Sequence, residues 1–314
     1  MSSTEVASSP ALFEFDRATN TTHIGQTSRG THLYAGTASS SWCIGSVPHG
    51  GYVLALVTDA VLRLYSTRHQ KDPVALNCFY LRKTDIKPFV VEVQDIKTSG
   101  KGYCVVRASL LQPKSDEQGV LTHAEEYDPA EYIEKVQTVF TMGNMDAEEG
   151  VTNFYEPYQP PNREKMTPFK HAFMGEFLVG KLDHSNIPSG GKSQGTPEFH
   201  QSLQFSDGRP IDFKSIPYWC DMFVTPPILL GQEVLGGPVW CPTMQLEVQF
   251  KRKPKPDDKE VLTSIVAPHI INGRFDCSGG VWDKDGTLLA LTRHQCLIVP
   301  WSRNTKSVAP KARF

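Results

Sequence analysis

Apolar and polar side chains alternate strictly along residues 244–250, where each even position is apolar and each odd one polar. This period of two predicts a strand with one buried face. Residues 217–223 read as a short apolar helix that carries one acid, Asp221. The prolines at 226 and 227 end this helix, because proline lacks a backbone N–H and clashes with the preceding turn. An acid on an apolar helix, followed by a strand that packs on it, is the unit around which we interpret the chain.

A second apolar segment, residues 52–62, has almost no polar face, so a helix there must be buried on most sides. Alternation and aromatic or β-branched content predict the remaining strands. They lie near residues 12–15, 75–82, 89–96, 103–111, 136–142, 198–205, 259–266, 281–282 and 288–291. The acidic segment 115–134 is expected to be an exposed excursion.

The order of these elements repeats. Each half reads as a strand, an apolar helix, a long strand that ends in basic residues, and then hairpin strands. A curved antiparallel sheet can wrap one helix and bury its whole circumference, so the repeat predicts a duplicated α+β unit. We place the two halves at residues 1–145 and 196–314. Proline- and glycine-rich stretches at 153–161 and 189–193 indicate a linker over 146–195, with regular structure resuming at residue 198.

Composition narrows the class of protein. The 314 residues suit two medium domains, and 39% hydrophobic with 21% charged residues is ordinary for a globular protein. A net charge of -2 gives no reason to expect nucleic acid or an anionic membrane as partner. We find no apolar run of membrane-spanning length and no secretory signal. Seven cysteines without a C-x-x-C spacing read as reduced, mostly buried thiols, so we expect a cytoplasmic protein.

Four motifs, taken in order, resemble those of the double-hotdog acyl-CoA thioesterases of the type II, thioesterase-like group. They are Pro-His-Gly-Gly-Tyr at 48–52, Trp-Cys-Asp at 219–221, Pro-Thr-Met-Gln-Leu at 242–246 and the run at 282–290. The resemblance covers roughly residues 35–300. It implies an α+β double hotdog, with two antiparallel sheets each wrapping a central helix. It also implies hydrolysis of an acyl-CoA or carrier-bound acyl thioester without a metal or another cofactor, in a chain that could stay monomeric or form a homo-oligomer.

The resemblance also implies site residues. In such thioesterases an acid on the second helix, a Thr at the start of the next strand and a Gln on the last strand hold the attacking water. Asp221 and Thr243 match the first two positions. The third falls on His294, and Gln295 stands one residue late. Successive strand residues point to opposite faces, so only one of these two can face the site.

Several assignments stay open at this point. Thr243 belongs by its odd number to the polar face of its strand, so a bulge or bend near residue 242 is needed to turn it inward. His49 could cap the first helix or contact the substrate. Gly50 and Gly51, at the start of that helix, suit an oxyanion site and an acyl or pantetheine channel. Aromatic residues that could shape a pocket, and could equally be core, are Trp42, Tyr80, Trp219 and Trp240.

The first half carries no matching acid. Single-hotdog thioesterases place one where this chain has Thr58, and Asp59 is one residue off. A helix turns about 100° per residue, so Asp59 is expected to point elsewhere. We therefore expect one active site. Two other readings stay open: a lyase, cyclase or isomerase of a polyketide-like substrate, with His294 carrying a proton, and a non-catalytic acyl-binding protein. We find no P-loop, dinucleotide fingerprint or metal-ligand motif in the sequence.

Overall fold

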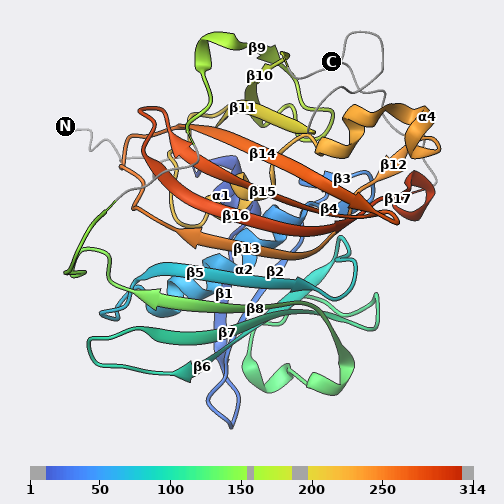
Figure 1. Cartoon of the computed structure of the whole chain (residues 1–314). Coiled ribbons are helices and arrows are strands. Elements are labelled where there is room, and N and C mark those ends of the chain that lie inside the picture. The colour runs from blue at the N-terminus through green and yellow to red at the C-terminus, as the bar shows by residue number, and fades with distance from the viewer. Residues whose placement is uncertain (1–11, 154–158, 186–196, 306–314) are drawn as a thin grey trace, which may run out of the picture.

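One antiparallel sheet of 13 strands runs through both halves of the chain in this computed structural model (Figure 1). The structure describes residues 12–153, 159–185 and 197–305. The first half contributes, in sheet order, β1 (Thr22–Gln26), β2 (His32–Thr37), β6 (Pro88–Lys97), β7 (Cys104–Pro113), β8 (Tyr132–Gly143) and β5 (Asp72–Tyr80). The second half continues with β13 (Thr243–Phe250), β16 (Leu288–Leu297), β15 (Arg274–Asp283), β14 (Glu260–Ile271), β11 (Glu198–Phe205), β10 (Leu178–Asp183) and β9 (Met166–Phe169).

The expected division into two sheets is wrong. Strands β5 and β13 pair antiparallel, with Gln245 opposite Phe79 and Gln249 opposite Ala75, and so join the halves. A strand at the edge of a sheet presents unpaired N–H and C=O groups, and here each half satisfies the other's edge. The expected repeat is confirmed, because β6-β7-β8-β5 in one half matches β14-β15-β16-β13 in the other.

Two helices lie inside the curved sheet and contact each other. Helix α2 (Gly50–Tyr65) is buried at every position from residue 51 to residue 61, as its all-round apolar sequence predicts. Helix α3 (Ile216–Asp221) has proline in its first turn and buries every residue except Asp221. Asp221 therefore stands at the end of a short buried helix, against the larger helix of the other half.

Short elements complete the chain. Two small two-stranded sheets pair β3 (Cys43–Ile44) with β4 (Val47–Pro48), and β12 (Val239–Trp240) with β17 (Val299–Pro300). The short helices are α1 (Glu14–Ala18), η1 (Ala124–Glu126), η2 (Pro129–Glu131), η3 (Arg163–Lys165), η4 (Pro226–Leu230), α4 (Gly231–Leu235) and η5 (Trp301–Arg303). Within the described ranges, no helix is long and apolar enough to cross a membrane.

The strand expected at residues 12–15 is wrong, since α1 begins there. Phe15 is buried, with its ring 5.1 Å from that of Trp42. Asp16 on the other side of this short helix pairs with Arg209 at 2.8 Å and with Lys214 at 2.7 Å. These contacts come from distant parts of the chain, and they override the local β preference.

The stretch expected to be a linker contains two strands, β9 and β10, which extend the sheet beyond β11. Strand β11 begins at Glu198, as predicted. The linker segment 189–193 and part of 153–161 lie outside the described residues. The boundaries of the two halves stay a prediction.

The acidic segment 115–134 is only partly the exposed excursion that its charge predicts. Its acids at 116, 117, 125 and 131 are exposed, whereas Leu121 and Tyr127 are buried against Leu33 and Val90 of the sheet. These contacts cover the outer face of the first half of the sheet. Local charge does not reveal them, because the apolar partners lie on strands far away in the sequence.

Candidate active site

The start of helix α2 forms one wall of the site. His49 caps this helix, because its Nδ1 accepts a hydrogen bond of 3.3 Å from the backbone N–H of Tyr52. A neutral imidazole that accepts at Nδ1 carries its proton at Nε2. The Gly51 N–H of the first helical turn has no acceptor within the helix and points toward Asp221 at the end of α3. This wall therefore presents hydrogen-bond donors.

The carboxylate of Asp221 reaches this wall from the other half of the molecule. Its Oδ2 accepts a hydrogen bond of 2.6 Å from the backbone N–H of Gly51. A Cβ at Gly51 would lie 2.9 Å from both the Asp221 Cβ and the Tyr218 Cα, and one at Gly50 would lie 2.7 Å from Asp221 Oδ2. The two glycines thus let α3 approach α2 this closely.

Two histidines flank Asp221. His49 Nε2 lies 3.6 Å from Oδ2, and His294 Nδ1 lies 3.6 Å from Oδ1. The side chains of His49, His294 and Asp221 are 4%, 0% and 9% exposed. Burial lowers the pKa of both histidines, and the nearby Asp221 carboxylate partly opposes this shift. Both imidazoles are therefore neutral near pH 7.

The two imidazoles present different atoms to the carboxylate. His294 Nε2 lies 3.2 Å from the carbonyl oxygen of Cys220 and 3.0 Å from Thr292 Oγ1. A carbonyl can only accept, so Nε2 carries the proton and Nδ1 is left as an acceptor. Nδ1 is buried without a hydrogen-bond partner among the described residues. Asp221 consequently lies between a donor, His49, and an unsatisfied acceptor, His294.

Gln295 points away from the site. It is exposed on the outer face of β16, whereas His294 faces inward beside α3, as strand alternation requires. Of the two candidates for the third position, the structure brings His294 to Asp221.

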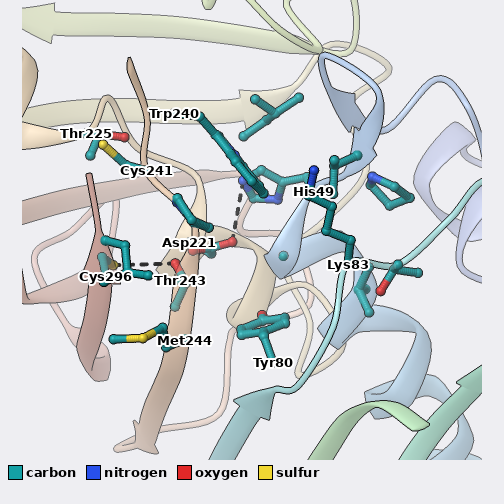
Figure 2. A pocket seen from close by; sticks show the side chains of 18 of the residues that line it. His49, Tyr80, Lys83, Asp221, Thr225, Trp240, Cys241, Thr243, Met244 and Cys296 are labelled. Atoms are coloured by element: carbon teal, nitrogen blue, oxygen red, sulfur yellow. Dashed lines mark hydrogen bonds and ion pairs between the residues drawn. The ribbon is translucent and has the colours of Figure 1, made fainter. Parts of the chain in front are cut away.

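A bulge turns Thr243 inward. Thr243 pairs with Cys296 and Gln245 with Gln295, so two steps on β13 match one step on β16. This is the irregularity that the sequence requires for Thr243 to leave the polar face. The Thr243 Oγ1 lies 3.5 Å from the Cys296 Sγ. Figure 2 shows both side chains beside Asp221.

A cavity of about 230 Å³ opens next to these groups (Figure 2). His49, Gly50, Asp221 and Thr243 line it. Its other polar and aromatic lining includes Tyr80, Arg82, Lys83, Thr84, Phe223, Trp240, Cys241 and Cys296. The cavity therefore combines apolar walls with a few convergent polar groups, as small-molecule sites do.

Trp42 and Trp219 do not line this cavity. Both are fully buried in an aromatic cluster, where Trp42 stacks on Phe177 at 4.9 Å and Trp219 lies 4.5 Å from Phe205. The other two candidate aromatic residues, Tyr80 and Trp240, do line it. Residue type alone cannot separate core from pocket aromatics, because both environments are apolar.

Asp59, the acid of the first helix, lies in a network of its own. Its Oδ2 accepts from the Thr21 backbone N–H at 3.0 Å, from Thr21 Oγ1 at 2.7 Å and from Arg63 Nε at 2.6 Å. Lys214 Nζ lies 3.5 Å from Oδ1. Thr58 bonds back to the carbonyl of Leu54. Neither residue lines the cavity.

Three soft donors lie together behind the site. The ligand atoms of Cys277, His294 and Cys296 are within 4.8 Å of one another, and all three residues are buried. The neighbouring Cys296 thiol and burial both raise the pKa of Cys277. A soft cation such as Zn²⁺ would bind here only after displacing thiol protons.

Sequence reasoning placed Asp221, Thr243 and the start of α2 in one site but missed two of its features. The contact between His49 and Asp221 joins residues 172 positions apart, which local periodicity cannot reveal. Arg82 and Lys83, which follow the end of β5, are at the cavity. Their basic character at a strand end was visible in the sequence, although its meaning was not.

Comparison with known proteins identifies the family. The N-terminal domain model of acyl-CoA thioesterases matches residues 38–124, and the C-terminal domain model matches residues 154–298. The chain belongs to the acyl-CoA thioesterase family. Each of its halves matches one domain of that family, in agreement with the repeat.

Three similar proteins have sequence identities of 14% to 23% with this thioesterase family member. The thioesterase-like protein TwmA of Talaromyces wortmannii is 23% identical over 332 residues, which is 90% of this chain and 93% of that protein. A putative thioesterase II from Thermobifida fusca YX has a TM-score of 0.72 at 16% identity, over 92% of this chain and 98% of that one. The acyl-CoA thioesterase II TesB2 from Mycobacterium marinum has a TM-score of 0.65 at 14% identity, over 91% and 98% of the two chains. At these identities the structures establish a shared fold alone.

Proposed function

We propose that this protein hydrolyses an acyl thioester, with Asp221 as the general base that takes a proton from the attacking water. The observation that carries the proposal is the position of Asp221, at the wall of the cavity between a donor imidazole and an acceptor imidazole. A carboxylate offers about four acceptor positions, and the described residues fill one of them with the Gly51 N–H. Room remains for a water that donates to Asp221 from the cavity.

His294, which contacts Asp221 but does not line the cavity, assists the proton transfer. Once Asp221 has taken a proton from water, its carboxyl group can donate to the unsatisfied Nδ1 of His294, 3.6 Å from Oδ1 in the resting site. The burial that lowers the pKa of His294 keeps this acceptor free of a proton. His294 is in this mechanism a positioning residue, and Thr243 on the bulge orients the water from the side of β13.

The start of α2 receives the charge that develops on the substrate. Attack of water on the thioester carbonyl gives an oxyanion, which preorganised N–H donors stabilise. The Gly51 N–H is engaged by Asp221, so the Gly50 N–H is the donor that this role requires. The carboxylate and the oxyanion site are then held by neighbouring residues of one helix.

The mouth of the cavity suits a phosphorylated carrier. Arg82 and Lys83 line it, and the Lys83 ammonium lies 4.8 Å from the centre of the Trp240 ring. Lys83 also donates to the backbone carbonyl of Arg303. Basic side chains beside an acyl-sized cavity can contact the phosphates of CoA or of a carrier's phosphopantetheine arm. Location in the cytoplasm and assembly into homo-oligomers stay predictions.

The test is release of free thiol from a panel of acyl-CoA thioesters that differ in chain length. We expect turnover with at least one of them, and the Asp221→Asn variant should lose about 10²- to 10⁴-fold in kcat, the usual contribution of a general base. Turnover at an unchanged rate in this variant would remove Asp221 from the mechanism.

A second candidate function uses the same residues for proton transfer. The His294–Asp221 contact could move a proton on a polyketide-like substrate, in a lyase, cyclase or isomerase reaction. A product that forms without thiol release would identify this activity. Tight binding of an acyl thioester with neither outcome would identify a non-catalytic acyl-binding protein.

The neighbours His294 and Gln295 offer a matched pair for the positioning role. His294→Ala should lower kcat at least about tenfold, because the protonated Asp221 loses its acceptor. Gln295→Ala removes an exposed side chain of the same strand and should leave kcat within about twofold, as surface substitutions usually do. Equal effects of the two substitutions would show that His294 has no special part in the site.

A further inference from the structure

The hydroxyl group of Tyr80 is buried at the cavity without a hydrogen-bond partner. Tyr80 is the last residue of β5, on the inward face with Leu76 and Cys78, and it lines the cavity. Within the described part of the chain, no group lies in hydrogen-bonding geometry with its oxygen. The Cys78 thiol lies close enough to interact weakly with this hydroxyl and to raise the pKa of Tyr80, but the contact is outside hydrogen-bond geometry. A buried hydroxyl without a partner is destabilising, so a ligand oxygen that accepts from it would supply a partner that the resting protein lacks.

The Tyr80 hydroxyl and the Asp221 carboxylate both lie close to Gly50. A Cβ built on Gly50 would lie 3.0 Å from the Tyr80 oxygen and 2.7 Å from Asp221 Oδ2. Both oxygens therefore border the same small space at the start of α2, which glycine leaves open. Figure 2 shows the Tyr80 ring below Asp221, with its oxygen turned toward that carboxylate.

The hydroxyl is a donor and not a base. Burial raises the pKa of Tyr80 well above its usual value, and the neighbouring Cys78 and Asp221 add to the shift. The O–H bond therefore stays intact near neutral pH. An unpaired donor beside a carboxylate base is suited to a substrate oxygen that gains negative charge.

We propose that Tyr80 is a catalytic residue whose hydroxyl binds the thioester carbonyl oxygen and, together with the Gly50 N–H, stabilises the oxyanion. This inference rests on the proposed hydrolysis. The water oxygen bonds to the carbonyl carbon, a water proton passes to Asp221, and the C=O π pair moves to the oxygen that Tyr80 holds. When the intermediate collapses, the C–S bond breaks and the departing thiolate takes the proton from Asp221. Tyr80 keeps its proton throughout.

Tyr80→Phe removes the donor and little else. Loss of one oxyanion donor costs about 10²- to 10³-fold in kcat, so we expect a fall of that size with KM within about threefold. The denaturation midpoint should be unchanged or higher, because the lost hydroxyl had no partner. Tyr65→Phe is the matched control, since Tyr65 is fully buried and donates to Asp95 Oδ1, outside the cavity. It should lower the midpoint and leave kcat within about twofold.

Binding of two non-hydrolysable acyl-CoA analogues tests the contact without turnover. One is a ketone in which CH₂ replaces the thioester sulfur, and the other is a thioether in which CH₂ replaces the carbonyl. Tyr80→Phe should weaken ketone binding about tenfold and leave thioether binding unchanged. Equal effects on both analogues, or a kcat within threefold of the unaltered protein, would overturn the role of Tyr80. If the unaltered protein releases no thiol from any acyl-CoA, the proposed hydrolysis fails, and the analogue comparison alone decides whether Tyr80 binds a carbonyl.

Discussion

The two halves of this thioesterase family member share one topology, yet the acids on their central helices differ in how completely they are satisfied. Asp59 on α2 holds the backbone and hydroxyl of Thr21, the guanidinium of Arg63 and the ammonium of Lys214. Asp221 on α3 has one N–H donor, from Gly51, and two imidazoles at 3.6 Å. The first carboxylate is held by these groups away from the cavity, whereas the second keeps acceptor positions beside it.

The difference shows that an acid on a buried helix is a candidate base only where its partners leave it free. It also shows that the two halves specialise. The first half contributes the start of α2, with His49, Gly50 and Gly51, and the second contributes Asp221, Thr243 and His294. Neither half contains both the carboxylate and the helix start that faces it.

Exchanging each acid for its amide gives the largest expected effects and tests this comparison directly. Asp221→Asn should remove about 10²- to 10⁴-fold of kcat and leave the denaturation midpoint close to that of the unaltered protein. Asp59→Asn should leave kcat within about twofold but lower the unfolding free energy by about 1–3 kcal/mol, because Arg63 loses its counter-ion and Lys214 keeps only Asp16. Thiol release and urea denaturation measure the two quantities. Loss of turnover in a folded Asp59→Asn protein would contradict the division of roles.

The close approach of the two helices is the next feature to break. Gly51→Ala places a methyl group 2.9 Å from the Asp221 Cβ and from the Tyr218 backbone, so α3 must shift away from α2. We expect a stability loss of about 1–3 kcal/mol, and a fall in kcat of at least about tenfold as Asp221 leaves its donor. Gly119→Ala is the control, since an added Cβ there meets nothing within 4 Å. A Gly51→Ala protein with unchanged kcat would show that this contact does not position the base.

Lowering the pH should give the smallest of the expected effects, a gradual loss of folding stability. Burial lowers the pKa of His49 and His294, and it lowers the pKa of His171 to about 4. The unfolded chain binds protons at these histidines near pH 6.5, before the folded protein does. Their stabilising effect is complete above that pH and is lost as the pH falls below it, for His171 until the pH reaches about 4. The loss is at most about 1.4 kcal/mol per pH unit for each histidine.

Urea midpoints measured between pH 7.5 and 4.5 check this expectation. His171→Leu should make the pH dependence shallower, because one of the three buried histidines is removed. The exposed His69 provides the control, and His69→Gln should leave the slope unchanged. A slope that is the same for all three proteins would exclude His171 as a source of acid sensitivity.

Much of the fold could be predicted from the periodic pattern of apolar and polar residues in the sequence. The all-round apolar run predicted α2, alternation predicted β13, and the repeat predicted the matching strand order. These elements are determined by which of their own faces is buried, which the sequence displays locally. The pairing of β5 with β13 and the helix at Phe15 depend on partners far away in the chain, so local periodicity could not predict them.

The candidate site, like the fold, could be predicted from the sequence only in part. The sequence left one condition open for each of Thr243 and His294, which are a bulge at the start of β13 and the choice between His294 and Gln295 as the inward-facing residue of β16. The cavity lining did not follow, because Trp42 and Tyr80 are both aromatic and only packing places one in the core and the other at the cavity. Alternation along β5 does put Tyr80 on the inward face, and this was the signal available for it.

The seam between β5 and β13 bears on how such a protein could arise from a smaller ancestor. Two identical copies that assemble through equivalent strands must each carry every catalytic group, since any change appears in both. Once the copies are fused in one polypeptide, a substitution affects one side alone. One copy can then lose its reactive carboxylate and use a neighbouring one to anchor its own fold, while its partner keeps an acid at the cavity.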